Sequence, residues 1–213
     1  MEDNNKDYIY VNIEEFDFKN IKIEKEKNKD TYIITYNDNY FYLISDCYFN
    51  SYGISTDKSN NEVKRISIIF DNNIKNNSDL KLIIQEIYNK IKSKLNVNIY
   101  NPISIKYNTI HIEINSKSTF YEYVNNTTEP KKLSYNKFLE YINFPFKITP
   151  IIYFKKLIIK NNVLYFNFCL KSAAIKYDDC PFTLNKLNKI YVNSNDKRKI
   201  NEKSSVNDNI ITF

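Results

Sequence analysis

Alternating apolar and polar positions run through the first third of the chain. Between Tyr8 and Phe70, short segments rich in Ile, Tyr, Val and Phe are separated by turns rich in Asn, Asp and Lys. Half-buried strands joined by short connections have this pattern. The first half is therefore predicted to be mostly β, with strands at the segments YIYVNI, KNIKIE, TYIITY, YFYLIS and VKRISIIF.

One segment of this half departs from the alternation. Residues 50–62, NSYGISTDKSNNE, have little apolar content and include Gly53, the single glycine of the chain. A segment with so little to bury has little to hold it in place. We expect a long mobile loop here.

The period of the apolar residues changes over residues 78–95, SDLKLIIQEIYNKIKSKL. Its apolar residues have the i, i+3, i+4, i+7 spacing of an amphipathic helix; they are Leu80, Ile83, Ile84, Ile87, Tyr88, Ile91 and Leu95. Ser78 and Asp79 are suited to cap its beginning, because their side chains accept hydrogen bonds from free backbone N–H groups. The segment SYNKFLEYI, residues 134–142, predicts a short second helix that ends before Pro145.

After the long helix the strand pattern returns. Strands are predicted at ISIKY, TIHIEI and STFYEYV, followed by two or three closing strands within residues 148–177. The fold class is therefore mainly β (α+β). We expect an OB-fold-like β-barrel, with the long helix between its third and fourth strands and the short helix as an addition. Residues 1–192 are predicted to form one domain. Residues 193–213, polar until the apolar IITF, are predicted to form a flexible tail.

The closing strands carry the candidate chemistry. Alternation puts an apolar set, Ile148, Pro150, Ile152 and Phe154, on one face of the first of these strands, and Leu164, Phe166, Phe168 and Leu170 on one face of the second. The opposite faces would then present a polar and aromatic set. We predict that one exposed surface contains Tyr153, Lys155, Tyr165, Asn167 and Lys171.

A surface of this kind suits single-stranded nucleic acid. Unpaired bases stack on aromatic rings, at about 1–3 kcal/mol per base, while lysines meet the phosphates without reading sequence. Lys64, Arg65 and Lys156 are further basic candidates for contacts with DNA. The other interpretation is that the tyrosines border the core and the lysines form a solvated face. Both interpretations stay open at this point.

The composition allows a polyanionic partner without identifying one. The formal net charge is +6 and the pI is about 8.9, so the chain is mildly basic. Asn, Ile, Lys and Tyr make up more than half of the residues, and all have AT-rich codons, so much of the lysine can reflect genome composition. Aromatic residues reach 15%, more than one core of this size requires, and we expect some of them to be exposed.

Several classes of site are disfavoured. A single glycine excludes the glycine-rich loops that cradle phosphates in nucleotide-hydrolysing proteins. His111 is the one histidine, and Cys47, Cys169 and Cys180 lie far apart, which argues against a zinc site or a Cys–His pair. We expect no enzyme, no catalytic residues, no metal and no cofactor. The sparse cysteines predict a reducing compartment, and no apolar run approaches the roughly 18 residues of a membrane span.

The chain also resembles a known family. The resemblance runs through residues 8–177 and rests on three features: YVNI followed by NIKI, VKRISIIF leading into LKLIIQEIYNKIKSKL, and ITPIIYF with its return strand VLYFNFCLKSAAI. In this order they are similar to the poxvirus-type single-stranded DNA-binding proteins of large cytoplasmic DNA viruses, with an insect poxvirus as one candidate source. The final residues, SSVNDNIITF, depart from the family pattern because Asp208 is their one acid.

The resemblance implies an OB-like core that coats single-stranded DNA cooperatively and without sequence preference. It implies a role in viral DNA replication, recombination or repair in the host cytoplasm. Partners would be single-stranded DNA, RNA more weakly, viral replication proteins and further copies along the strand, with no membrane. The alternative is a viral protein-interaction or virion structural protein with no role on DNA.

Overall fold

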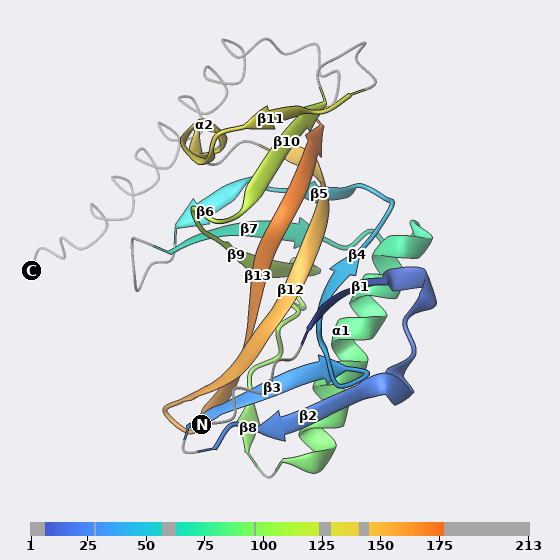
Figure 1. Cartoon of the computed structure of the whole chain (residues 1–213), viewed down its shortest axis with the longest axis vertical. Coiled ribbons are helices and arrows are strands. Elements are labelled where there is room, and N and C mark those ends of the chain that lie inside the picture. The colour runs from blue at the N-terminus through green and yellow to red at the C-terminus, as the bar shows by residue number, and fades with distance from the viewer. Residues whose placement is uncertain are drawn as a thin grey trace, which may run out of the picture. The chain divides into compact units, whose positions relative to one another are not determined.

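The alternating segments predicted as strands form strands in the computed structural model (Figure 1). The model describes residues 7–27, 29–56, 63–95, 97–123, 129–140 and 145–176, without the side chain of Lys155. The predicted strands are β1 (Tyr8–Asn12), β2 (Ile21–Lys25), β3 (Thr31–Tyr36), β4 (Tyr40–Ile44), β7 (Lys64–Ile69), β9 (Thr109–Ile114), β10 (Thr119–Tyr123), β12 (Phe146–Lys160) and β13 (Val163–Lys176). Short strands missing from the prediction are β5 (Phe49–Ser51), β6 (Ile54–Thr56), β8 (Asn98–Ile99) and β11 (Lys131–Leu133).

The chain divides into a first compact unit, Met1–Tyr177, and a second, Asp178–Phe213. The second unit lies outside the described residues. So do the predicted domain boundary at residue 192 and the predicted tail, residues 193–213.

The described strands include a closed, five-stranded barrel, and the expectation of a mainly β, OB-fold-like barrel is confirmed. Neighbouring strands pair in the ring β5–β7–β9–β13–β12 and back to β5. Numbered along the chain, this ring has the order 1-2-3-5-4-1, a Greek-key arrangement of the OB type. The pair β9–β13 is parallel and the other pairs of the ring are antiparallel.

The predicted position of the long helix in the barrel order was wrong. Helix α1 (Lys75–Lys94) lies between β7 and β9, the second and third strands of the ring. The short helix α2 (Tyr135–Leu139) lies between the third and fourth. The sequence could not give this order, because β1 to β4 lie outside the ring and the first ring strand, β5, falls in a segment without an apolar pattern.

That segment was predicted to be a loop from residue 50, and this part of the prediction was wrong. Phe49 and Ser51 of β5 are buried, and the Ser51 hydroxyl accepts a hydrogen bond from the N–H of Gly53. Gly53 has a φ of 99°, a conformation that glycine adopts without steric cost, and it turns the chain directly into β6. The later part of the predicted loop, residues 57–62, lies outside the described residues.

Helix α1 begins one turn earlier than the sequence indicated. Its N-cap is Ile74, without a side-chain cap, and Ser78 and Asp79 lie inside the helix. Local hydrogen bonds before the helix replace the expected cap: the Asp71 carboxylate accepts the N–H of Asn73, and the amide oxygen of buried Asn77 accepts the N–H of Asp71. The predicted short helix is present as α2, and its N-cap is Ser134, whose hydroxyl accepts a hydrogen bond from the N–H of Lys137.

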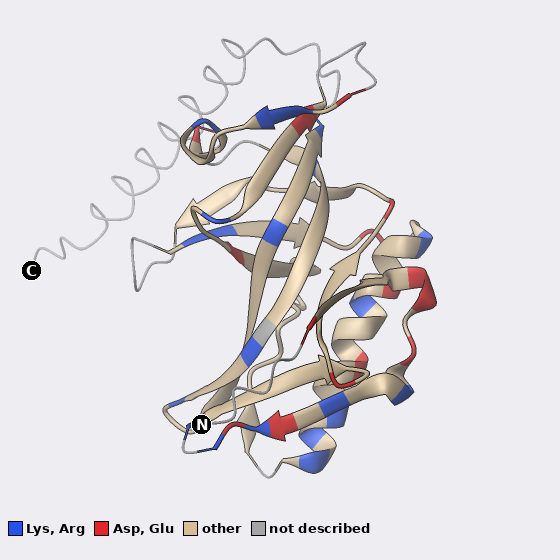
Figure 2. Ribbon diagram, in the orientation of Figure 1, with Lys and Arg blue, Asp and Glu red and all other residues tan. Residues whose placement is uncertain are grey.

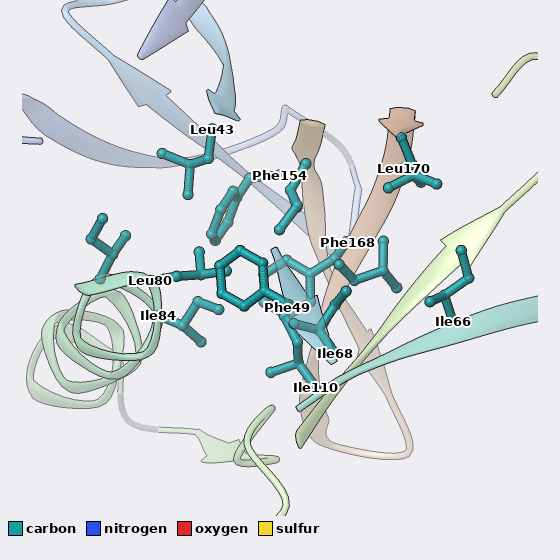
Figure 3. Close-up of a cluster of buried hydrophobic side chains, with 14 of the residues drawn as sticks. Leu43, Phe49, Ile66, Ile68, Leu80, Ile84, Ile110, Phe154, Phe168 and Leu170 are labelled. Atoms are coloured by element: carbon teal, nitrogen blue, oxygen red, sulfur yellow. The ribbon is translucent and has the colours of Figure 1, made fainter. Parts of the chain in front are cut away.

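The apolar face of α1 packs against the barrel. Leu80 and Ile84 from the helix are fully buried beside Phe49 and Ile68 from barrel strands (Figure 3). Near the other end of the helix, the Lys90 ammonium donates to the carbonyl oxygens of Phe18 and Ile21. These bonds fasten the 3₁₀ helix η2 (Phe18–Asn20) and the start of β2 to α1, and a second 3₁₀ helix, η1 (Ile13–Glu15), precedes η2.

The segment ISIKY, predicted as a strand, forms a turn instead. Ser104 makes one isolated bridge with Thr109, Ile105 is 91% exposed, and Asn108 has a φ of 50°. An Ile105 side chain exposed to this degree buries almost no apolar surface, so it does not stabilise a strand. The turn leaves residues 100–107 as a wall beside β9 and β13, where the candidate site lies.

The barrel's longest elements, β12 and β13, form one hairpin that crosses the described unit (Figure 1). A two-residue turn, Asn161–Asn162, joins them, and both residues have positive φ, at 51° and 59°. Asparagine tolerates this conformation and is favoured in such tight hairpin turns. The hairpin contains two register shifts, at Ile151/Ile152 and at Phe154/Lys156.

Candidate nucleic-acid interface

The outward face of the β12–β13 hairpin holds most of the predicted site residues. Opposite residues in the register are Tyr153 and Cys169, Lys156 and Asn167, and Ile158 and Tyr165. The register shift at Phe154/Lys156 places Lys156 on the same outward face as Tyr153, whereas strict alternation would place it on the opposite face.

Lys155 and Asn167 differ from the other members of the predicted surface. Lys155 is the extra residue of the register shift, and its side chain lies outside what the structure describes. Cys169, which alternation also puts outward, is 6% exposed. The Cys169 thiol donates a hydrogen bond to the amide oxygen of Asn167 at 3.5 Å, so the Asn167 side chain is engaged by a residue of its own strand.

A groove of about 650 Å³ opens where β9 and β13 part. These strands pair at Glu113 and Cys169, and the residues that precede this pair on both strands line the groove. One wall of the groove is formed by residues 100–107, which follow β8. The lining residues are Arg65, Tyr100, Pro102, Ser104, Tyr107, His111, Glu113, Ile158, Lys160, Tyr165, Phe166, Asn167 and Phe168.

Exposed aromatic rings border this groove. Tyr100 and Tyr165 are stacked, with ring centroids 5.5 Å apart and an interplanar angle of 27°, and they are 60% and 37% exposed. Tyr107 is also exposed, and the Lys106 ammonium lies 5.0 Å from its ring centroid. Both rings are absent from the predicted site: Tyr100 precedes the predicted strands, and Tyr107 belongs to ISIKY, which was predicted as a strand and forms a turn.

The two basic candidates on β7 are separated. Arg65 lines the groove and lies directly opposite Glu113 of β9. Lys64 lies on the other face of the strand, where its ammonium donates a hydrogen bond to the hydroxyl of Thr56 at 3.0 Å. Lys160 adds a second cation to the groove. Figure 2 shows Lys and Arg spread over several elements, including β12, β13 and α1, so the site is defined by local geometry more than by one large basic patch.

His111, on the polar face of β9, projects outward into this groove beside Arg65. Desolvation, followed by the charge of Arg65, lowers the pKa of His111 from its ordinary value of 6.5. Near neutral pH the imidazole is therefore uncharged. A phosphate bound beside it would favour the protonated form.

A second aromatic surface lies at the other side of β12. We call Tyr8, Tyr10, Tyr40, Tyr42 and Tyr153 the tyrosine ladder. Ring centroids are 5.2 Å apart for Tyr8–Tyr40, 5.1 Å for Tyr10–Tyr42 and 5.5 Å for Tyr42–Tyr153. The register aligns these residues across β1, β4 and β12.

The ladder was missed apart from Tyr153, although the sequence holds a signal for it. Tyr8 and Tyr10, and likewise Tyr40 and Tyr42, are two residues apart in predicted strands, which puts each pair on one face. Burial, and then the hydrogen bond with Tyr8, raise the pKa of the Tyr153 hydroxyl. The Tyr153 hydroxyl therefore stays protonated and uncharged at physiological pH.

Lys171 links the ladder to the hairpin. Its ammonium lies 5.8 Å from the centroid of the Tyr42 ring, within the range of a cation–π contact. Lys171 is exposed and lies on β13, two residues beyond Cys169. The predicted residues Tyr153 and Lys171 thus come together at the ladder, while Tyr165 and Asn167 come together at the groove.

Two further properties concern the part of the chain that the structure describes. That part of the chain contains no cluster of three or more His, Cys, Asp and Glu side chains placed to hold a metal ion. It also has no helix with the length and apolar character needed to cross a membrane.

Comparisons of the chain with models of known protein families and with curated protein sequences find no match. The family resemblance drawn from the sequence therefore stays a prediction.

Proposed function

We propose that this chain binds single-stranded DNA, without reading its sequence, in the groove and on the adjoining outward face of the β12–β13 hairpin. The observation that carries the proposal is the exposed, stacked pair Tyr100 and Tyr165, in the same groove as Arg65 and Lys160. Exposed rings offer platforms to unpaired bases, and neighbouring cations meet the phosphates between those bases.

The position of the groove on the barrel supports the same conclusion. OB folds bind oligonucleotides on the face of their second and third strands and with the loop between their fourth and fifth. Those strands are β7 and β9 here, and they contribute Arg65, His111 and Glu113 to the groove. Lys160 stands directly before the turn that joins the fourth and fifth strands.

The family resemblance supports a role in viral DNA replication, recombination or repair, in the host cytoplasm and together with viral replication proteins. Such a role requires binding to many sequences. Lysine suits this requirement, because its ammonium is a point charge that meets phosphate without distinguishing bases.

A titration across salt concentrations tests the proposal. Fluorescence anisotropy with labelled oligo(dT), a duplex of equal length and an RNA of equal length would give the three affinities. We expect the tightest binding to oligo(dT), with log affinity falling against log salt at about 0.7 per contacted phosphate. Equal affinity for the duplex, or no binding at all, would contradict the proposal.

A protein-binding role is the second candidate. It is favoured by the exposure of Tyr8 and Tyr10, at 52% and 59%, because exposed tyrosines are common in protein interfaces. A partner captured by the chain with an affinity independent of salt, together with absent DNA binding, would favour this function.

A further inference from the structure

We infer that the bound DNA strand continues from the groove onto the tyrosine ladder, so that the N-terminal strands β1 and β4 form a second stacking region of one extended site. This inference rests on the proposed function. It assigns a role to residues outside the barrel and predicts that binding energy depends on DNA length.

Strand register joins the two regions. Tyr165 and Lys171 lie on β13 on either side of Cys169, and Cys169 is opposite Tyr153 of the ladder. Tyr153 is in turn paired with Tyr42 of β4, which is paired with Tyr10 of β1. Tyr165 and Lys171 are six residues apart on one strand, which corresponds to about 20 Å at roughly 3.3 Å per residue. A single strand can follow this line without leaving the outward face.

The ladder has the two chemical elements that a single strand requires. Its outermost rings, Tyr8 and Tyr10, are more than half exposed at 52% and 59%, and are already held by stacking on Tyr40 and Tyr42. Because the rings are ordered before DNA arrives, little side-chain entropy is lost when a base stacks on them. Lys171 supplies the positive charge beside them.

The charge of the surrounding surface also admits an anion. The positions of β1, β4, β12 and β13 that make up this surface hold Tyr, Asn, Ile and Lys, with no Asp or Glu among them; they are Tyr8, Tyr10, Asn12, Tyr40, Tyr42, Ile44, Tyr153 and Lys171. A phosphate backbone would therefore meet no opposing carboxylate on these strand positions. Glu113 of β9, opposite Cys169, is a carboxylate at the groove end of this line. At the ladder itself, the pairing of aromatic rings with the Lys171 cation favours nucleic acid over a second protein surface.

Oligonucleotide length separates the two regions experimentally. We would measure the affinity for oligomers of about 5 and about 20 thymidines, which bracket the roughly 4–16 nucleotides that one OB fold occupies. The variants are Tyr8→Ala/Tyr10→Ala and the single Tyr10→Ala. Tyr52→Ala is the matched control, because Tyr52 is 56% exposed and belongs to neither the groove lining nor the ladder.

We expect the double variant to lose roughly 10-fold or more in affinity for the long oligomer, and to bind the short one as the wild-type chain does. Tyr52→Ala should bind both as the wild type. If the double variant keeps full affinity for the long oligomer while its fold is intact, the inference is wrong and the proposed function stands. If the wild-type chain binds neither oligomer, the proposed function itself fails.

Photocrosslinking provides a readout that does not depend on affinity. A long oligomer containing bromodeoxyuridine should crosslink to peptides containing Tyr8, Tyr10 or Tyr42, as well as to a peptide containing Tyr100 or Tyr165. Crosslinks confined to the groove peptides would overturn the inference. Self-association of the wild-type chain that the double variant loses, without any change in DNA binding, would assign the ladder to a second copy instead and overturn it as well.

Discussion

The ammonium of Lys171 lies 5.8 Å from the centre of the Tyr42 ring, although the two residues come from the last and the fourth strands of the described unit. A cation at this place can meet a phosphate while the exposed rings of Tyr8 and Tyr10, which stack on Tyr42, accept bases. Lys171→Gln should therefore weaken binding to oligo(dT) and reduce the slope of log affinity against log salt by about 0.7. Lys94→Gln, on the exposed end of α1, is the matched control and should leave the slope unchanged. An unaltered slope in Lys171→Gln would remove this residue from the site.

Adjacent residues on β7 provide a sharper pair of variants. Arg65 lines the groove and Lys64 faces the other side of the strand, so each loses one positive charge on mutation to Gln but only one change falls in the groove. We expect Arg65→Gln to reduce single-strand affinity by roughly 5- to 10-fold, corresponding to about 1 kcal/mol. Lys64→Gln should change it by much less. Equal losses would indicate that net charge, and not the groove, determines binding.

Stacking at the groove is tested by two replacements of one residue. Tyr165→Ala removes the ring that stacks on Tyr100 and should weaken single-strand binding by about 1–3 kcal/mol. Tyr165→Phe retains the ring, and we expect it to retain most of the affinity. Anisotropy titration with oligo(dT) measures both. Equal weakening by the two variants would assign the effect to the hydroxyl and count against stacking.

The sequence predicted the fold class and most strands, because buried alternation in segments such as Thr109–Ile114 is visible from residue types alone. It did not predict β5. This strand consists of Phe49–Ser51, too short for a periodic pattern, and its burial depends on pairing with β12 and β7, which are distant in sequence. The predicted strands before the long helix also include β1 to β4, which lie outside the ring, so the number of strands before the helix does not give its place in the barrel order.

The candidate site was predictable in part for a similar reason. Tyr153, Tyr165, Asn167 and Lys171 follow from alternation within two strands, which is local information. The groove depends instead on where β9 parts from β13 and on a turn carrying Tyr100, and neither is encoded in one segment. Placing both Lys64 and Arg65 among the contact residues was an avoidable error, because adjacent strand residues face opposite sides, and this is local information.

Packing of α1 on the barrel should account for a large share of stability. Ile84 is fully buried against the core, whereas Leu82, two residues earlier, is 52% exposed. Ile84→Ala should lower the free energy of unfolding by about 2–5 kcal/mol, through lost burial and a residual cavity. Leu82→Ala should change it by less than about 0.5 kcal/mol. Urea denaturation followed by circular dichroism measures both, and similar losses would contradict the observed face of the helix.

The pH dependence of DNA binding should show whether a phosphate binds beside His111. Its pKa lies below 6.5 in the free chain, because desolvation and Arg65 disfavour the imidazolium, and a bound phosphate would raise it. The bound state then takes up more protons than the free state, so affinity should rise as pH falls through the region around and below 6.5, and level off above it. His111→Gln should abolish this rise while it preserves the affinity near pH 8, where the wild-type imidazole is uncharged. Titrations between about pH 5.5 and 8 at constant ionic strength would show the difference, and parallel curves for the two proteins would exclude a phosphate beside His111.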